Sequence, residues 1–278
     1  MEQVRMPGKV DYFVEGRIRK IKLLLTRVLP ESLLFELKKL HYVRSLKSFS
    51  EKDVAVVKLL VKPGDYVIDI GPHVGWYTRI LSELVGEHGR AYSLEPVPQT
   101  FDILSTCVRK LRLKNVELIN CAISDHNGSG SMEVPLFEGG GENFYQAHIV
   151  LNSERSASLR RFNVTLRTID TLFCAAASQI SFIKCDVVTH EYSVIKGAKR
   201  LITISKPVWL IEMSGDPDLQ DSDSFMLFNY LTKEGYSAYW FDGQALNKRS
   251  VGHRPVNYFF LTLRHIGLLK DCGMLILE

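Results

Sequence analysis

The chain has 278 residues, of which 46% are hydrophobic and 24% charged, and its formal net charge at pH 7 is +4. This length and composition suit one α/β core with a small appendage, so we expect a single main domain. No stretch approaches the roughly 20 apolar residues of a membrane span, and the N-terminus lacks the apolar core and cleavage site of a secretory signal. We therefore expect a cytoplasmic protein.

Cysteine and histidine usage predicts neither a disulfide framework nor a metal centre. The five cysteines include no Cys-x-x-Cys pair and fit small buried side chains in a reducing compartment. The eight histidines are scattered and form no His-x-x-x-His pair. We expect no bound metal, although a Mg²⁺ ion shared between acidic side chains and a substrate hydroxyl stays an open alternative.

The positive charge belongs to residues 1–50, which hold 11 Lys and Arg against 5 Asp and Glu. Apolar and basic residues recur at helical spacing over 17–25 and 33–40, on either side of Pro30, which predicts two short amphipathic helices. The simplest account is that they pack on the main domain. A basic amphipathic segment can also lie on an anionic membrane surface or hold an anionic substrate. We expect no nucleic-acid partner, because the main domain does not interleave aromatic and basic residues.

Strands and helices then alternate, which favours a parallel, doubly wound sheet. The expected elements are a helix at 51–61, a strand at 66–70, a loop at 71–75, a helix from Gly75 to Gly86, a strand at 91–94, a helix from Pro98 whose end Asn115 caps, and a strand at 116–123.

Residues 124–168 break this alternation and predict a β insertion, with strands near 131–136 and 162–166 and a glycine loop at 138–143. Insertions at the carboxyl edge of an α/β sheet commonly form substrate walls. The later elements are a strand at 180–186, a helix at 190–201, a strand at 207–212, a helix from Phe225, and strands at 237–241 and 256–261 that pair as an antiparallel edge hairpin. The main domain is expected over 51–265, and 266–278 is expected to be a C-terminal tail.

The loop after the first strand predicts the type of ligand. A dinucleotide loop needs three glycines so that a pyrophosphate can approach the backbone, but His73 and Trp76 occupy the second and third positions. What remains is Asp69-x-Gly71-x-x-x-Gly75, with an acid two residues before the first glycine. A carboxylate there repels phosphates and suits an ammonium or sulfonium group. S-adenosylmethionine (SAM) carries both of these groups and has no phosphate.

Glu95 ends the next strand, where an acid accepts hydrogen bonds from ribose hydroxyls. This position fits SAM and NAD equally, so it does not discriminate between them. The plain alternative is that Asp69 and Glu95 are ordinary strand-end or helix-capping acids. Asp186 and Glu212 also lie at the carboxyl ends of predicted strands, the edge at which open α/β sheets bind ligands.

With these strands placed, the chain resembles the FkbM family of SAM-dependent methyltransferases, which methylate hydroxyl groups of sugars, polysaccharides and polyketide-type products. The resemblance covers about residues 50–265 and is carried by Val67–Thr78, Leu94-Glu95-Pro96, Asn120-Cys121-Ala122 and Phe182–Ala198. It implies a Rossmann-like class I methyltransferase fold with SAM as cofactor and a hydroxylated small molecule or glycan as acceptor. The residues implied to hold SAM are Asp69, Gly71, His73, Gly75, Tyr77, Glu95, Pro96, Ala122 and Asp186.

The chain departs from the family pattern at two pairs of residues. Family members usually carry Glu-Gly where this chain has Val188-Thr189, and Ala-Asn where it has Pro72-His73. The first change removes an acid and a flexible glycine beside the expected site, which bears on substrate choice and on activity. The second leaves both flanking glycines in place.

Methyl transfer from a sulfonium to a hydroxyl is an in-line displacement that needs an aligned oxygen and removal of its proton. Asp186 or His190 is the expected proton acceptor, and Glu191 and Glu212 are expected to bind the acceptor. Glu191 has a second explanation, because it opens a helix whose dipole favours an acid. Two other functions stay open: a SAM-binding scaffold or partner protein without catalysis, and an NAD-dependent enzyme, which the missing glycines disfavour.

Overall fold

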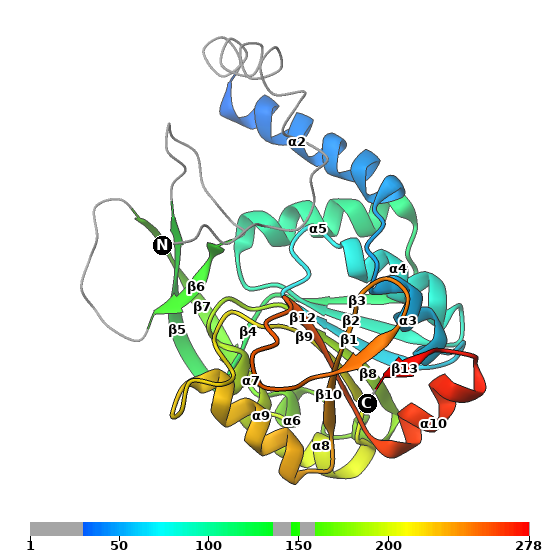
Figure 1. Cartoon of the computed structure of the whole chain (residues 1–278). Coiled ribbons are helices and arrows are strands. Elements are labelled where there is room, and N and C mark those ends of the chain that lie inside the picture. The colour runs from blue at the N-terminus through cyan, green and yellow to red at the C-terminus, as the bar shows by residue number, and fades with distance from the viewer. Residues whose placement is uncertain (1–29, 136–145, 151–158, 278) are drawn as a thin grey trace, which may run out of the picture.

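The computed structural model describes residues 30–135, 146–150 and 159–277 (Figure 1). The helix predicted at 17–25 and the glycine loop predicted at 138–143 lie outside the described residues. Within the described residues, no helix combines the length and the apolar character needed to cross a membrane.

A nine-stranded sheet, in the order β13-β11-β10-β12-β9-β8-β1-β2-β3, forms the centre of the described part of the chain. Its parallel part consists of β1 (Tyr66–Ile70), β2 (Arg90–Leu94), β3 (Val116–Ile119), β8 (Ile180–Cys185) and β9 (Val208–Glu212). The order reverses direction at β1, so the chain first builds outward to β3 and then returns to the other side. The predicted doubly wound, mostly parallel sheet is therefore confirmed.

Alternate residues of the central strands face two separate apolar layers. Val67 faces a core formed with α3 (Val54–Leu60), α4 (Trp76–Val85) and α10 (Leu263–Asp271), whereas its neighbour Ile68 faces the opposite core. That second core is covered by α6 (Ile169–Leu172), α7 (Glu191–Lys196), α8 (Lys199–Ser205) and α9 (Asp223–Lys233). Strands that are buried on both faces explain the near-continuous apolar runs in the sequence.

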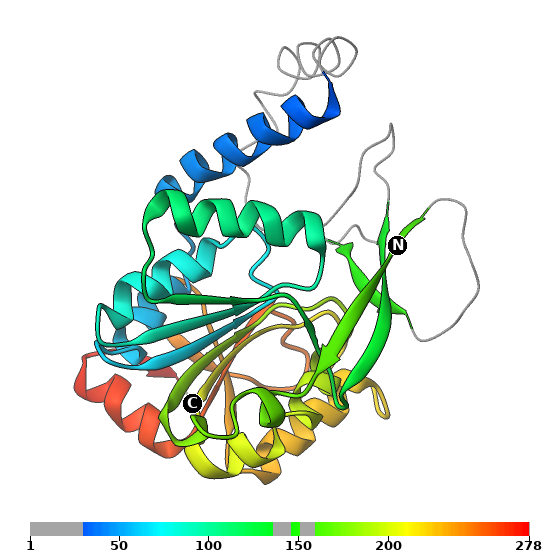
Figure 2. The same cartoon turned by 180° about the vertical axis from the view of Figure 1, so that it is seen from behind.

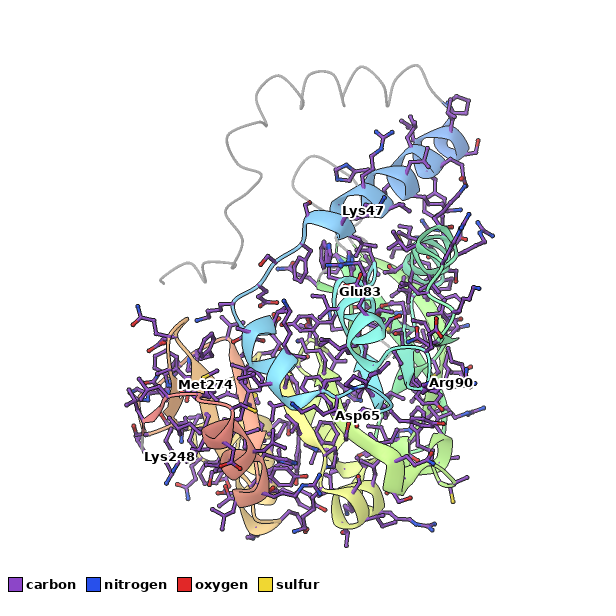
Figure 3. The ribbon with its side chains drawn as sticks, turned by 90° about the vertical axis from the view of Figure 1, so that its right-hand side faces the viewer. Lys47, Asp65, Glu83, Arg90, Lys248 and Met274 are labelled. Carbon is purple, nitrogen blue, oxygen red and sulfur yellow. The ribbon has the colours of Figure 1, made fainter. Side chains whose placement is uncertain are left out.

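The predicted hairpin is an antiparallel pair, but it does not form the edge of the sheet. Strand β12 (Asn257–Leu261) pairs with β9 on one side and with β10 (Ser237–Phe241) on the other. Beyond β10 lie β11 (Leu246–Lys248) and β13 (Ile276–Leu277). Lys248 and Met274 mark this edge in Figure 3. The segment between the two strands of the pair thus contributes a strand of its own, β11.

Residues 266–277 pack on the main domain and do not form an appended tail. The expected boundary at residue 265 falls inside α10, whose Ile266 and Leu269 are buried against the sheet. Strand β13 then pairs in parallel with β11. Both apolar side chains recur at helical spacing, so this segment carries the amphipathic pattern of a packed helix.

The β insertion forms a separate four-stranded sheet, in the order β4-β7-β5-β6 among the described residues. Its strands are β4 (Ala122–Ile123), β5 (Gly128–Pro135), β6 (His148–Val150) and β7 (Leu159–Arg167). The strand predicted at 116–123 is therefore two strands in two sheets. Figures 1 and 2 show the insertion on the side of the main sheet away from α10.

Two local predictions were wrong for identifiable reasons. Asn115 does not cap α5 (Pro98–Leu111); its amide donates to the carbonyl oxygens of Ser82 and Gly86 at 2.8 Å each and so caps α4. The helix predicted at 190–201 is broken between α7 and α8. Asp170 stabilises the separate start of α8, because its carboxylate accepts the backbone N–H groups of the first turn of α8 at 2.8 and 2.9 Å.

Helix α2 (Glu31–Ser45) and the short 3-10 turn η1 (Leu46–Ser48) lie against α5. Lys39 forms an ion pair with Asp102 of α5 at 2.7 Å, and Leu46 is buried between the two helices and the loop after β1. In Figure 3, Lys47 marks the end of α2 that meets the body of the molecule. The described part of the N-terminal segment therefore packs on the main domain.

The packing of α10 predicts a difference between two leucines of the same helix. Leu269 is fully buried, whereas Leu263 is 84% exposed. Leu269→Ala should lower the free energy of unfolding by about 2–5 kcal/mol, and Leu263→Ala by less than about 0.5 kcal/mol. Urea unfolding followed by circular dichroism measures both. Equal effects would mean that the C-terminal segment does not pack as described.

Candidate active site

A pocket opens at the carboxyl ends of β1, β2 and β8. Eight of the nine residues expected to hold a cofactor line it, namely Asp69, Gly71, His73, Tyr77, Glu95, Pro96, Ala122 and Asp186. Gly75, the ninth, lies behind the wall and begins α4 with a φ of 102°. The structure thus brings together residues from three strands that are far apart in the sequence.

The two glycines of the loop have different structural tasks. Both have positive φ, 72° at Gly71 and 102° at Gly75, a region that L side chains rarely adopt. A Cβ at Gly71 would lie 1.9 Å from the backbone oxygen of Asp186, and a Cβ at Gly75 would lie 2.7 Å from Leu104 Cδ1. Gly71 therefore permits the close contact of two strand ends, and Gly75 permits the packing of α4 on α5.

Asp69 is held by the hydroxyl group of Thr78, which in turn contacts the hydroxyl group of Ser93. Thr78 Oγ1 donates to its carboxylate at 2.7 Å and lies 2.9 Å from Ser93 Oγ. Burial raises the pKa of Asp69 to about 6, while the Thr78 hydrogen bond and the Lys184 ammonium oppose the shift. A buried acid that is easily ionised and faces a pocket suits a ligand that brings positive charge or donated hydrogen bonds.

Glu95 is only 5% exposed and lines the same pocket as Asp69, at the end of the adjacent strand β2. Its carboxylate accepts the Val97 backbone N–H at 3.0 Å, and its backbone oxygen accepts the Asn120 side-chain amide at 2.7 Å. Burial raises the pKa of Glu95 to about 8, although backbone N–H donors of Val97 and His73 oppose it. One oxygen is thus engaged by the protein, and the carboxyl group still faces the pocket.

An aromatic stack joins the N-terminal segment to the pocket loop. Trp76 stacks on Phe49 at a centroid distance of 5.4 Å and on His73 at 5.6 Å, and Tyr42 meets His73 edge-on at 6.1 Å. His73 has a φ of 51°, and burial lowers its pKa to about 3, so its ring is neutral at pH 7. The stack gives this loop a fixed apolar wall, whereas a loop with more glycines would be flexible.

Lys184 is a pocket residue that the sequence analysis did not single out. It lies on β8 with its side chain 2% exposed, and its Nζ is 3.4 Å from Asp186 Oδ2. The ammonium also lies 5.4 Å from the centroid of the Tyr77 ring. A lysine inside the otherwise apolar strand Ile180–Cys185 was the available signal, because an isolated buried charge is costly.

Glu212 and Glu191, the acids expected to bind the acceptor, do not line the pocket within the described residues. Glu212 ends β9 beside Asp186; burial, and next the Asp186 charge, raise its pKa to about 7. Glu191 is 4% exposed and accepts hydrogen bonds from the Ser214 backbone N–H at 3.2 Å and Oγ at 2.6 Å. Both acids stand behind the pocket wall.

His190 lines the pocket and lies next to the hydroxyl group of Ser124, at the start of the β insertion. Its Nε2 lies 3.0 Å from Ser124 Oγ, and burial lowers its pKa, so the ring is neutral at pH 7. A neutral imidazole has one acceptor nitrogen. If Ser124 donates to Nε2, the proton sits on Nδ1 and the ring cannot accept another; if Nε2 donates to Ser124, Nδ1 is the free acceptor.

Val188 lines the pocket and Thr189 has a φ of 60°. This is the pair at which the chain differs from the expected Glu-Gly pattern. A β-branched residue in the left-handed region is strained. Thr189 therefore adopts a backbone conformation that suits the glycine it replaces.

Residues of the β insertion line the remaining side of the pocket, as such insertions commonly do. Met132 on β5 and three residues around β6 complete the lining: Ala147, His148 and Ile149. Apart from His148 this wall is apolar. Across the described residues, no group of three or more His, Cys, Asp or Glu side chains has an arrangement that could hold a metal ion.

Comparison with protein families gives one match that covers more than half of the chain. The family described as "Methyltransferase FkbM domain" matches residues 69–238. The matched range begins at the first acid of the pocket and includes the loop after β1, Glu95 and the end of β8.

Curated relatives and solved structures match more weakly. Protein-L-isoaspartate O-methyltransferases of Methanococcus aeolicus and Methanococcus maripaludis are each 30% identical, over 59 and 56 residues, and the chain spans about a quarter of their length, 27% and 26%. These segments are 21% and 20% of this chain. The structure of methyltransferase FkbM from Methylobacillus flagellatus KT is 15% identical, with a TM-score of 0.46, over 88% of this chain and 59% of that one. Aeropyrum pernix fibrillarin with natively bound SAM is 14% identical, with a TM-score of 0.43, over 73% of this chain and 68% of that one.

The contact at Gly71 predicts different effects for two glycines of positive φ. A Cβ at Gly71 meets the Asp186 backbone oxygen, whereas a Cβ at Gly64, with a φ of 90°, meets nothing within 4 Å. Gly71→Ala should weaken SAM binding at least tenfold and lower stability, because the two loops must separate. Gly64→Ala should cost about 1–2 kcal/mol of strain and leave affinity unchanged. Calorimetric titration with SAM tests the pair, and equal affinities would contradict the contact.

The raised pKa of Glu95 predicts how stability depends on pH. Between the ordinary value of 4.5 and about 8, the folded ligand-free protein holds a proton that the unfolded chain has lost. The free energy of unfolding should therefore fall as the pH rises through this window, and the contribution of Glu95 should be level above pH 8. Glu95→Gln should reduce the fall, whereas the exposed Glu117→Gln should not. Thermal unfolding at pH 5, 6.5 and 8 measures this; identical slopes in all three proteins would contradict it.

Proposed function

The chain belongs to the FkbM methyltransferase family, and from this membership we propose that it transfers a methyl group from SAM to a hydroxyl of a sugar, a polysaccharide, or a glycosylated or polyketide-type metabolite. One observation carries the proposal. Asp69, Glu95 and Asp186 face a single pocket from the ends of three adjacent strands. A cationic ligand and a hydroxyl acceptor bound in this pocket would thus each meet a different acid. NAD is disfavoured, because acids and a histidine stand where a pyrophosphate needs bare backbone.

The pocket residues fit SAM in charge and in shape. SAM supplies the methyl group as an electrophile on its sulfonium. Glu95 is placed to accept hydrogen bonds from ribose hydroxyls, and Asp69 faces the same pocket and favours positive charge. Gly71 lets the pocket loop approach the Asp186 backbone, and the Trp76 stack holds the loop in one conformation.

On the acceptor side, Asp186 is the better-placed proton acceptor. Its side chain is 41% exposed at the pocket, so an incoming hydroxyl can reach it. His190 shares its Nε2 with Ser124 and accepts a proton only in one tautomer. We therefore assign proton removal to Asp186 and orientation of the acceptor to His190. Glu212 and Glu191 act indirectly, because neither lines the pocket within the described part of the chain. Glu212 acts through Asp186, and Glu191 acts through the loop after β9.

The alternative is a SAM-binding scaffold or partner protein without turnover. It is favoured by one observation: Val188 places an apolar side chain on the pocket wall where the family pattern has an acid. The two functions differ in one measurement, because a scaffold binds SAM and transfers no methyl group to any acceptor.

The proposed location is the cytoplasm, where the reducing environment suits the free state of Cys107, Cys121, Cys174, Cys185 and Cys272. A weak contact of residues 1–50 with an anionic membrane surface fits the outer face of α2. Leu33, Leu37 and Leu40 are 46%, 45% and 49% exposed there at helical spacing. Arg44 in the last turn of α2 and Lys47 in η1 are exposed nearby, and such basic side chains attract anionic headgroups.

The transfer reaction is tested by incubating the protein with tritium-labelled SAM and cellular glycan fractions, after calorimetry with SAM, S-adenosylhomocysteine and NAD. SAM should bind, NAD should not, and label should appear in a hydroxyl-bearing fraction. Asp186→Asn should lower the rate by about 100-fold or more, whereas His190→Ala should lower it by about tenfold or less.

Each result has a clear consequence for the assignment. Binding of NAD alone would overturn the proposed function, and SAM binding without label in any fraction would favour the scaffold. If His190→Ala abolishes transfer while Asp186→Asn keeps it, the proton acceptor is His190.

Membrane contact is tested by sedimentation with liposomes that contain anionic lipid. The double variant Leu33→Glu, Leu37→Glu should bind several-fold less protein to liposomes than the unchanged chain. Leu219→Glu is the matched control, because Leu219 is 60% exposed and lies outside the N-terminal segment. Equal sedimentation of all three proteins would contradict the contact.

A further inference from the structure

Both ends of the short helix α7 contact the same two residues at the start of the β insertion. His190 precedes the helix, and its Nε2 lies 3.0 Å from Ser124 Oγ. Lys196 is the last residue of the helix, and its Nζ lies 2.6 Å from Asp125 Oδ2. Ser124 and Asp125 are adjacent in the chain and thus hold the helix at both ends, and His190 at one of those ends lines the pocket.

The backbone fixes how closely these two segments approach each other. A Cβ at Gly197, directly after α7, would overlap the backbone oxygen of Ser124, so only a glycine permits this contact. Ser124 is 1% exposed, and its N–H donates to the oxygen of Arg167 at the end of β7 at 2.9 Å. The Ser124 hydroxyl therefore meets His190 with little freedom to move.

The Ser124 hydroxyl has a second partner, the carboxylate of the next residue. It donates to Asp125 Oδ1 at 3.3 Å, and His126 Nδ1 lies 2.8 Å from the same oxygen. The hydrogen bond from Lys196, and next the one from His126, hold the pKa of Asp125 well below its usual range. The carboxylate is therefore ionised at pH 7, and an ionised carboxylate can only accept hydrogen bonds.

The number of available protons decides the direction of the hydrogen bond between Ser124 and His190. A serine hydroxyl has one proton to donate, and a neutral imidazole carries its proton on one of its two nitrogens. If Ser124 gives its proton to Asp125, His190 Nε2 must be the donor. In the opposite arrangement, a lone pair of Ser124 would face the Asp125 carboxylate at 3.3 Å, which is unfavourable beside a full negative charge.

We propose that Ser124 and Asp125 are positioning residues that hold His190 with its proton on Nε2, so that Nδ1 accepts a hydrogen bond from the methyl acceptor. The role of the acceptor rests on the proposed function, whereas the site of the proton does not. Within the described residues, the His190 ring forms its hydrogen bond to Ser124 and no other, which leaves Nδ1 available. Asp186 remains the proton acceptor, and Nδ1 of His190 fixes how the methyl acceptor lies beside it.

The site of the proton is measured with long-range ¹H–¹⁵N correlation spectra of the full chain, labelled with ¹⁵N-histidine, at pH 7.5. A protonated and an unprotonated ring nitrogen differ strongly in chemical shift, and the signals lost in His190→Gln identify those of His190. The unchanged protein should show the tautomer protonated on Nε2 in at least about tenfold excess, because a hydrogen bond to an ionised group is stronger than a neutral one.

Two variants separate the Asp125 carboxylate from its ion pair. Asp125→Ala removes the acceptor of the Ser124 hydroxyl, so both directions of the hydrogen bond to His190 become possible, and the two tautomers should come within about threefold of each other. Lys196→Met removes the ion pair and keeps the carboxylate, so the excess should persist. If Asp125→Ala does not fold, Asp125→Asn keeps the shape and removes the charge, and the excess should still fall several-fold.

Three results would overturn the proposal. The first is an unchanged protein with the His190 proton on Nδ1. The second is an excess that stays the same when the Asp125 carboxylate is removed. The third is a Lys196→Met variant that shifts the ratio of tautomers as far as Asp125→Ala does.

Transfer assays show whether this hydrogen bond orients the methyl acceptor. With a glycan fraction that takes up label from tritiated SAM, Ser124→Ala should raise the KM for that fraction by about fivefold and change kcat by less than about twofold. Ser82→Ala is the matched control, because Ser82 is a 4% exposed serine that donates to Asn115 Oδ1 at 2.5 Å on α4. It should change neither constant. A fall in kcat at unchanged KM in Ser124→Ala would overturn the positioning role.

The proposed function and this inference fail separately. If no fraction takes up label, the proposed function fails, and the spectra still locate the proton on His190. If label is transferred but the His190 proton lies on Nδ1, only the positioning role is overturned.

Discussion

The contact between the ends of β1 and β8 governs the rest of the pocket. The Asp186 backbone N–H donates to the Ile70 oxygen at 3.0 Å, and the Gly71 N–H donates to the Leu94 oxygen at 3.1 Å. Three strand ends are thus joined by two backbone hydrogen bonds, with no room for a side chain at Gly71. The backbone at this contact therefore sets the distance between the side chains of Asp69 and Asp186. The Asp69 and Asp186 sides of the pocket therefore cannot shift independently.

The same contact concentrates acids in a region of low solvent access, and the protein reduces the cost in two ways. On the side of Asp69 and Glu95, hydroxyl and backbone donors stabilise the two acids, and burial raises their pKa values to about 6 and about 8. Glu95 therefore holds a proton at pH 7 in the ligand-free protein, whereas Asp69 is mostly ionised. On the side of Asp186, the Lys184 ammonium supplies a positive charge.

The sequence predicted the parts of this design that depend on local pattern. Alternation and glycine placement located β1, α4, β2 and the acids of the pocket, because each strand end follows a short apolar run. The sequence did not predict features that depend on contacts between distant segments. Asn115 caps α4 through Gly86, 29 residues earlier, and Asp170 caps the start of α8 at Arg200, 30 residues later. Strand β13 has only two residues and is too short to show alternation; it is defined by its pairing with β11. Lys184 is hard to recognise from sequence because it is the one charged residue of the otherwise apolar strand Ile180–Cys185.

The departure at Val188-Thr189 separates two properties that the family pattern combines. Thr189 keeps a left-handed φ of 60°, and its N–H donates to Ser214 Oγ at 3.2 Å, which in turn donates to Glu191 at 2.6 Å. Such strain persists only where neighbours determine the conformation. The glycine-like backbone is thus retained through Ser214 and Glu191, whereas the acid at Val188 is lost. Because the left-handed backbone is kept, the departure changes the polarity of the pocket wall beside Asp186.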